Sequence, residues 1–398
     1  MRILLVNHFP LIGSGSGTYT LNVAKGLVKL GHNVLVLVPE HTFIDGYPFP
    51  VETLIFNNGK GTNFDLPFNF PCFTTHPRSN VTFYELDDWQ IHTYTNAWHM
   101  AIRRSIEAFH PDIIHANHVW IIPYVVSAMD IPYVITCHGT DLIGFRKDPR
   151  YREMALRAAE KASAIIAISY SVAAEAKTTY GLTEDKVHVI EGGFDPKIFR
   201  PMPYIQKKDV LASIGITVAQ DKPMVVFVGK LTAFKGVDTL LRAAIIYESM
   251  LPGVHTLIIG DGEQKESLRN LSRKLGLKGI HFVGHQSQRV IAQVYNVADV
   301  CVFPSHKEPF GLVAVEALAC GCPVIATKAG GFQEYINQQV GVLVPVNDYK
   351  TLANAIFNKI SGESRQHRRI YAAKYALQNF SWQSQVRKIM AIYERLLV

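Results

Sequence analysis

The stretch "RILLVNHFPLIGSGSGTYTLNVAKGLVKLGHNVLVLV", residues 2–38, has two short apolar runs separated by a glycine-rich loop and a segment of helical periodicity. The runs at 2–7 and 33–38 have the length and side chains of buried strands, and the helical pattern stops at Gly31. A strand, a glycine turn, a helix and a second strand make a βαβ unit, whose two strands are parallel. The opening of the chain therefore predicts an α/β fold.

The same alternation recurs along the whole chain. Further strand-like runs occupy 111–117, 131–139, 162–169 and 186–193, with helix-like segments around them. After a proline-rich polar stretch at 195–209, "DPKIFRPMPYIQKKD", the pattern restarts with "PMVVFVG" and continues through "VHTLIIGDG", "IHFVG", "ADVCVFPS", "CPVIAT" and "VGVLVPV". Continuous apolar strands indicate sheets covered on both faces.

The length of 398 residues suits two domains better than one core. We therefore expect two doubly wound, Rossmann-like domains facing one another across a cleft, residues 1–200 and 201–379. Ligands of such sheets bind beyond the carboxyl ends of the strands, where the glycine-rich turns lie.

Composition and charge narrow the function classes. The longest apolar runs are short and contain proline, and "MRILLV" has no long apolar continuation, so we expect neither a membrane span nor a signal peptide, and a cytoplasmic protein. Residues 1–200 carry 17 Lys and Arg against 19 Asp and Glu, whereas 201–398 carry 23 against 14. The basic half suits an anionic ligand such as a nucleotide, or peripheral contact with an anionic membrane; no aromatic-interleaved basic stripe favours nucleic acid. The five cysteines are expected to be buried free thiols.

Residues 41–98 form a long segment with 13 aromatic residues and no clear periodicity. Its aromatic content argues against disorder. Two interpretations stay open: a loop packed on its own small core, or a surface that receives a ring-shaped acceptor by stacking.

The stretch "EPFGLVAVEALACGCPVIAT", residues 308–327, places two glutamates in apolar surroundings. Pro309 and Gly311 exclude a helix until about Leu312, and Gly321 ends it. The N-terminus of this helix is an anion site suited to phosphate. Glu308 and Glu316 can then accept hydrogen bonds from hydroxyls on either side of that phosphate, as in a nucleotide sugar; the alternative is that Glu316 pairs with a Lys or Arg.

Lys230 and Lys235 lie in "VGKLTAFKG", on the turn after the first strand of the second domain. Both ammonium groups can reach one diphosphate from there. The alternative is a solvated pair on an exposed loop.

The first domain offers two weaker signals. Its loop from Gly13 to Gly17 reads G-x-G-x-G, which departs from the dinucleotide fingerprint, although Glu40 ends the second strand where a ribose-binding acid would lie. His138, with His115 and His118 of the neighbouring strand, is expected at the strand tips, as catalytic or structural histidines; a metal is not expected.

Taken together, these motifs resemble the retaining glycosyltransferases of family 4, which have the GT-B fold. The resemblance covers almost the whole chain, from "GSGTYTLNVAKGLVKLGHNV" through "HGTD", "IEGGFDPKIFRP", "FVGKLTAFKGVDTL" and "LIIGDGEQKESL" to "ADVCVFPSHKEPFGLVAVEALACGCPVIATKAGGFQEYI". It implies that residues 1–200 bind the acceptor, that 201–379 bind the donor, and that the C-terminal helix 380–398 packs back on the first domain.

The resemblance also implies roles for individual residues. Glu316 would bind the ribose, Glu308 the transferred sugar, and Lys230 and Lys235 the diphosphate, while His138 would lie at the reacting sugar. The remaining donor-binding positions implied are Gly15 over the β-phosphate, Val283 and His285 at the base, and the backbone of Phe310, Gly311, Leu312 and Val313. This chain has Lys230 where the family usually has Arg, Ser14 in its glycine pair, and Gly192 in place of an Asn.

The function implied is transfer of a hexose-type sugar, with retention and without a metal or other cofactor, from an NDP-sugar. A UDP-sugar is the expected donor, and the acceptor is a hydroxyl of a small polyol, a glycan or a lipid-linked sugar. The alternatives are a sugar-nucleotide epimerase on the same fold, an NAD-dependent oxidoreductase and a non-catalytic sugar-nucleotide-binding protein. Nothing in the sequence points to an oligomeric state.

Overall fold

The computed structural model describes residues 1–59, 62–74, 76–217, 221–362 and 365–397. The chain divides into two compact units: unit 1 is Met1–Gly192 with Trp382–Val398, and unit 2 is Gly193–Ser381. The first junction falls before the expected residue 200 because Phe194 and Phe199 are buried in the core of unit 2.

Unit 1 is built on a seven-stranded sheet in the order β3-β2-β1-β4-β5-β6-β7, and each neighbouring pair is parallel. Alternate residues of β1 enter opposite cores: Leu4 and Val6 pack on one face, Ile3 and Leu5 on the other. The strands are β1 Arg2–Val6, β2 Asn33–Glu40, β3 Val51–Ile55, β4 Ile113–Asn117, β5 Tyr133–Cys137, β6 Ala164–Ala167 and β7 Val187–Val189.

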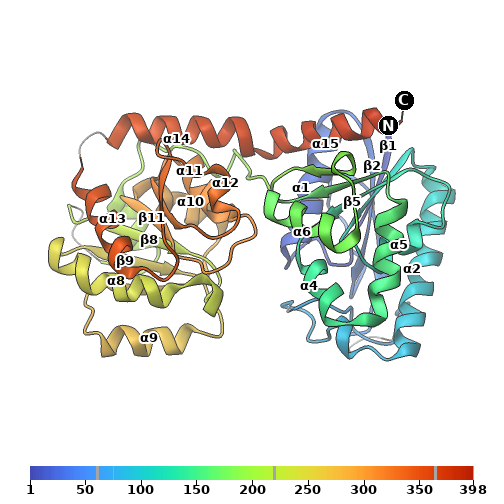
Figure 1. Cartoon of the computed structure of the whole chain (residues 1–398), viewed down its shortest axis with the longest axis horizontal. Helices are drawn as coiled ribbons and strands as arrows, with labels where there is room; N and C mark the ends of the chain where they lie inside the picture. The colour runs from blue at the N-terminus through green and yellow to red at the C-terminus, as the bar shows by residue number, and fades with distance from the viewer. Residues whose placement is uncertain (60–61, 75, 218–220, 363–364, 398) are drawn as a thin grey trace. The chain divides into compact units, whose positions relative to one another are not determined.

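Helices cover both faces of the unit 1 sheet. The face that carries Ile3 and Leu5 packs against α1 and the C-terminal helix α15, whose Trp382 ring contacts the Tyr19 ring of α1 with a centroid distance of 5.4 Å. The other face packs against α2 to α6 (Figure 1). The helices are α1 Gly15–Lys29, α2 Asp88–Phe109, α3 Ile121–Val126, α4 Thr140–Lys147, α5 Arg152–Lys161, α6 Tyr170–Tyr180 and α15 Trp382–Leu396, with short 3-10 turns at Phe83–Glu85, Pro149–Tyr151 and Glu184–Lys186.

Unit 2 repeats this plan with a six-stranded parallel sheet in the order β10-β9-β8-β11-β12-β13. All six predicted strands of this half are present: β8 Met224–Val228, β9 His255–Ile259, β10 Ile280–Gly284, β11 Val300–Phe303, β12 Val324–Thr327 and β13 Gly341–Val344.

The helices of unit 2 also form two layers. One face packs against α8, α9 and α13, and the other against α7, α10, α11, α12 and α14 (Figure 1). Their bounds are α7 Lys207–Ser213, α8 Val237–Met250, α9 Lys265–Lys274, α10 Gln288–Val297, α11 Leu312–Ala319, α12 Phe332–Tyr335, α13 Tyr349–Ser361 and α14 Arg365–Phe380, with a 3-10 turn at Ala233–Lys235.

The expectation for residues 41–98 is wrong in part. The segment contains edge strand β3, a 3-10 turn and the start of α2; its residues 60–61 and 75 lie outside the described residues. Its packing is also different, because Phe56, Phe70, Phe83 and Trp98 join the main core of unit 1 rather than a small core of their own.

Two further expectations concern membranes and thiols. Within the described residues, none of the helices combines the length and the apolar character that crossing a bilayer requires. The five cysteines are buried and free, as predicted.

Candidate functional site

Both sheets have a point where the strand order reverses, between β1 and β4 in unit 1 and between β8 and β11 in unit 2. In open α/β sheets the loops leaving two such strands diverge to opposite faces, which opens a crevice for ligands at their carboxyl ends. In unit 2, Lys230 follows β8 and Glu308 follows β11. The sequence-predicted donor residues therefore flank the switch point of unit 2.

Lys235 and Glu308 form an ion pair at this switch point. The Lys235 ammonium nitrogen lies 2.6 Å from Oε2 of Glu308, whose side chain is only 7% exposed. The Ser305 hydroxyl donates a hydrogen bond of 3.1 Å to the same oxygen, and Thr327 Oγ1 donates to the Ser305 carbonyl at 2.5 Å. Glu308 is thus held by two donors on one oxygen, which leaves Oε1 as its outer hydrogen-bond acceptor.

The loops after β8 and β11 are joined by their backbones. The amide of His306 donates to the carbonyl of Phe234 at 2.7 Å. Gly236 has a φ of +63°, and a Cβ there would lie 2.0 Å from the carbonyl oxygen of Pro304, so only glycine fits this close approach. This contact brings Lys235 and Glu308 together although they are distant in sequence.

Helix α11 begins at Leu312, as predicted, and no side chain caps its N-terminus. Gly311 precedes it with a φ of +86°, and a Cβ there would lie 2.2 Å from the ring of Phe332. Leu312 and Val313 are half-buried, whereas the Phe310 ring is buried against Tyr335 and Phe380. The uncapped N–H groups and the helix dipole can bind an anion, and Phe310 contributes through its backbone alone.

Glu316 lies one turn inside α11 and is 8% exposed. Among the described residues its carboxyl group has neither a hydrogen-bond donor nor a cation beside it, so the ion-pair alternative gains no support. Burial raises the pKa of Glu316 to about 8. A carboxyl group buried without a partner is costly, which indicates a ligand that supplies donors.

A cavity of about 290 Å³ lies at the carboxyl ends of β8 and β9. Lys230 and His285 line it, and Ile259 and Ile291 add apolar surface. Val283 does not line it; this residue belongs to β10 and packs against the core. The cavity brings one of the two predicted base-binding residues next to a predicted diphosphate-binding lysine.

In unit 1 the glycine loop leads directly into α1. Ser14 caps the helix by accepting a 3.0 Å hydrogen bond from the Gly17 amide, and Gly15 has open space around its Cα. A Cβ at Gly17 would lie 2.0 Å from the carbonyl oxygen of Pro10. Gly17 is thus required for packing, while Gly15 leaves the loop surface open to a ligand.

His138 follows β5 and is held by Asn117 at the end of β4. Its Nε2 lies 2.9 Å from Oδ1 of Asn117, whose amide group is oriented by a bond to the Val6 carbonyl. Nε2 of His138 therefore carries the proton, and Nδ1 is an acceptor. Burial, with a smaller effect of His115, lowers the pKa of His138 to about 3, so the ring is neutral at physiological pH and can form hydrogen bonds but carries no charge.

His115 and Glu40 are held by protein partners, whereas both ring nitrogens of His118 are buried without a hydrogen-bond partner in the described part of the chain. His115 is inside β4, with its nitrogens 2.5 Å from the Tyr393 hydroxyl and 2.6 Å from Thr136 Oγ1, so its placement at a strand tip is wrong. His118 is buried and contacts the His138 ring at a centroid distance of 4.7 Å. Glu40 is held by Arg78 through bonds of 2.7 and 3.1 Å and is not open to a ribose.

Sequence reasoning missed Ser305, Asn117 and the glycine pair Gly330–Gly331. The Gly331 amide donates to the Glu308 carbonyl at 2.9 Å, and a Cβ at Gly330 would lie 2.1 Å from that oxygen. Ser305 could have been identified as a site residue from the sequence, because it lies in the loop that follows β11, three residues before Glu308. In the described part of the chain, His, Cys, Asp and Glu side chains do not gather in the groups of three that would suggest a metal site.

Two family models match separate parts of the chain. The model of glycosyl transferases group 1 matches residues 214–376, and that of glycosyltransferase family 4 matches residues 13–198. An uncharacterized glycosyltransferase of Methanocaldococcus jannaschii is 28% identical, over 99% of this chain and 98% of the relative. A D-inositol 3-phosphate glycosyltransferase of Mycolicibacterium smegmatis is 29% identical, over 100% of this chain and 91% of the relative.

Solved structures show the same fold. Sucrose-phosphate synthase from Thermosynechococcus elongatus superposes with a TM-score of 0.76 and 22% identity, covering 100% of this chain and 99% of that one. Anabaena HepE, solved with UDP and glucose, gives 0.74 and 23%, covering 99% and 100%. With two Rossmann-like units and both family models matched, the chain belongs to the group 1 and family 4 glycosyltransferases, which have the GT-B fold.

Proposed function

We propose that this glycosyltransferase transfers a hexose-type sugar with retention from a UDP-sugar to an acceptor hydroxyl, without a metal. The observation that carries the proposal is the buried, unpartnered carboxyl group of Glu316 inside a helix whose N-terminus is uncapped. A nucleoside diphosphate offers both missing partners, because its phosphates can accept from the helix and its ribose hydroxyls can donate to Glu316.

The diphosphate is bound in this proposal by Lys230, Lys235 and the first amides of α11. Lys235 can serve both the diphosphate and Glu308, since an ammonium group has three donors and Glu308 Oε2 takes one of them. Oε1 of Glu308 then accepts from a hydroxyl of the transferred sugar. The base occupies the 290 Å³ cavity at His285. HepE, whose crystals contain UDP or UDP-glucose, supports the choice of a uridine donor.

The reaction forms a bond between the acceptor oxygen and the anomeric carbon on the face from which the diphosphate departs. The leaving phosphate oxygen takes the acceptor proton, and the two lysines with the α11 N-terminus stabilise its negative charge. His138, neutral at physiological pH, is proposed to accept a hydrogen bond from the reacting sugar through Nδ1. Retention thus needs no covalent sugar–enzyme intermediate.

The NAD-dependent alternative is disfavoured by Glu40. A ribose-binding acid must offer free oxygens at the end of the second strand, and both Glu40 oxygens accept from Arg78. A sugar-nucleotide epimerase would use the same donor site, and the production of a new glycoside separates it from a transferase.

The test is the melting temperature with UDP, GDP, ADP and NAD, each at about a hundred times a plausible Kd, where specific binding adds about 2.7 kcal/mol. We expect a rise with UDP and a smaller one, or none, with the others. A rise with NAD alone, or with none of the four, would contradict the proposal.

A further inference from the structure

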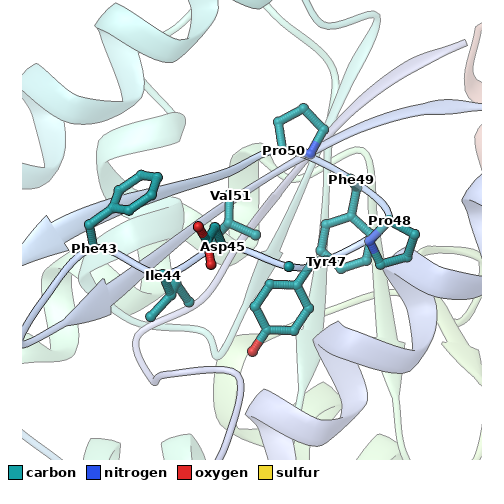
Figure 2. Close-up of a pocket in the computed structure, with 9 residues that line it drawn as sticks. Phe43, Ile44, Asp45, Tyr47, Pro48, Phe49, Pro50 and Val51 are labelled. Carbon is teal, nitrogen blue, oxygen red and sulfur yellow. The ribbon is translucent and has the colours of Figure 1, made fainter.

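The β2–β3 loop from Phe43 to Pro50, together with Val51 at the start of β3, surrounds a hollow of about 520 Å³ in unit 1 (Figure 2). The loop begins just beyond the carboxyl end of β2, the edge at which open α/β sheets bind ligands. The volume is within the range of small-molecule sites. The donor residues lie in unit 2, so this hollow takes no part in the donor binding proposed above.

Aromatic rings form much of its wall. The Phe43 side chain is 72% exposed, unlike the other phenylalanine of the loop, Phe49, which is 6% exposed. The Tyr47 ring stacks on Phe49 with centroids 5.6 Å apart and planes at 19°. Pro48 and Pro50 restrict the backbone around this pair. The Tyr47 ring is therefore held in place before any ligand arrives.

The polar groups of the hollow suit hydroxyls. Asp45 is exposed between Phe43 and Tyr47, and among the described residues its carboxylate has no hydrogen-bond or ion-pair partner (Figure 2). Burial, together with the charge of Glu40, raises the pKa of the Tyr47 phenol, which keeps its proton and can donate. A free acceptor and a free donor beside aromatic rings match a ring with several hydroxyls.

The local charge argues against an anionic ligand. Arg78 is the cation that acts on Tyr47, and its guanidinium donates to both oxygens of Glu40 and to the carbonyl of Ile12. The Arg78 charge is thus paired with Glu40, while the charge of Asp45 remains uncompensated among the described residues. A phosphate group or an anionic membrane would be repelled here.

We propose that the β2–β3 loop binds a neutral polyhydroxylated ring, a pyranose or a cyclitol, as part of the acceptor. The ring stacks on Phe43 and Tyr47 and donates a hydroxyl hydrogen bond to Asp45. That the bound ring is an acceptor rests on the proposed function. Binding of the ring to the loop can be measured independently of that function.

The experiment is saturation-transfer NMR of the full chain with UDP present, using methyl α-D-glucopyranoside, methyl α-D-mannopyranoside and myo-inositol as neutral probes. Two anionic probes are compared with them: myo-inositol 1-phosphate in the same experiment, and phosphatidylglycerol vesicles in a sedimentation assay. The variants are Phe43→Ala and Asp45→Asn. Phe64→Ala is the matched control, because it removes a partly exposed ring of the same segment outside the loop. The UDP-induced rise in melting temperature of each variant reports that the donor site is intact.

We expect at least one probe to bind, with affinity lowered roughly three- to ten-fold by Phe43→Ala, as expected for the loss of one ring contact. Asp45→Asn should also weaken binding, and Phe64→Ala should not. Binding of no probe, or equal binding to Phe43→Ala, would overturn the inference. Tighter binding of myo-inositol 1-phosphate than of myo-inositol would also overturn it. The same holds if Phe43→Ala weakens binding to phosphatidylglycerol vesicles but leaves the affinity for the neutral probes unchanged. Ring binding without a UDP shift would support this site and contradict the donor proposal instead.

Discussion

Replacing Glu316 by Gln should make the protein more stable at alkaline pH. The Glu316 carboxyl group is buried in α11 and lacks a partner among the described residues, and burial raises its pKa from 4.5 to about 8. Glutamine has nearly the same shape and no charge. The variant therefore removes the ionisation while it preserves the packing.

The sign follows from the protons bound in each state. Between pH 4.5 and about 8 the folded protein keeps the Glu316 proton, whereas the unfolded chain has lost it. The free energy of unfolding of the wild type therefore falls as pH rises through this window. The stability that the protonated Glu316 contributes is fully present only below pH 4.5. A difference of 3.5 pH units (8 − 4.5) at 1.36 kcal/mol each sets an upper limit of about 5 kcal/mol. We expect Glu316→Gln to exceed the wild type in free energy of unfolding by a few kcal/mol at pH 8.5 and by almost nothing at pH 5.

The assay is urea unfolding at pH 5, 7 and 8.5, followed by far-UV circular dichroism and by tryptophan fluorescence. The four tryptophans, at 89, 98, 120 and 382, all lie in unit 1, so fluorescence reports that unit while Glu316 lies in unit 2. The pH dependence of the dichroism transition should differ between wild type and Glu316→Gln, and that of fluorescence should not. Glu263→Gln, which changes an exposed carboxylate, is the control.

Saturating UDP adds a second comparison. Ribose hydroxyls that donate to the Glu316 carboxylate favour its ionised form, so UDP should stabilise the wild type more than the variant at pH 8.5. Equal pH dependence of wild type and Glu316→Gln in the dichroism transition would refute the reasoning.

Three further predictions concern Glu308 and its support. Lys235→Ala and Glu308→Gln should each lower donor turnover at least about a hundredfold, as measured by release of UDP from UDP-sugar, because each removes a group that contacts the donor; near-normal rates would exclude these roles. Ser305→Ala loses a hydrogen bond to a charged oxygen, worth about 2 kcal/mol, and should lower turnover about thirtyfold with an unchanged Kd for UDP; a weaker Kd instead would indicate a merely structural residue. Gly330→Ala should lower the melting temperature more than Gly276→Ala, since both have a positive φ but only Gly330 faces a backbone oxygen, and equal losses would contradict this packing argument.

The parallel sheets could be predicted because their strands are continuous apolar runs with glycine turns between them. The start of α11 was equally visible, since Pro309 and Gly311 exclude helix and the residues from Leu312 favour it. Edge strand β3, "VETLI", was missed because it has polar residues and lies among prolines, and its pairing with β2 comes from the tertiary structure.

The site was predictable as a set of residue types rather than as a set of contacts. Position at a strand end identified Lys235 and Glu308 as donor-binding candidates, but their ion pair joins loops that are 73 residues apart. His115 shows the opposite error. Its partner Tyr393 lies 278 residues away on the C-terminal helix, so nothing near His115 in sequence indicates that the ring is structural.

The most direct test of the central claim is the release of nucleoside diphosphate from UDP-glucose, GDP-mannose and ADP-glucose in the presence of EDTA, with the anomer of the freed sugar followed by NMR. We predict release of UDP from UDP-glucose, an α-anomer as the first product, and loss of both in Lys235→Ala. No release from any of the three donors, a first product of β configuration, or activity that EDTA abolishes would contradict a metal-independent retaining transferase.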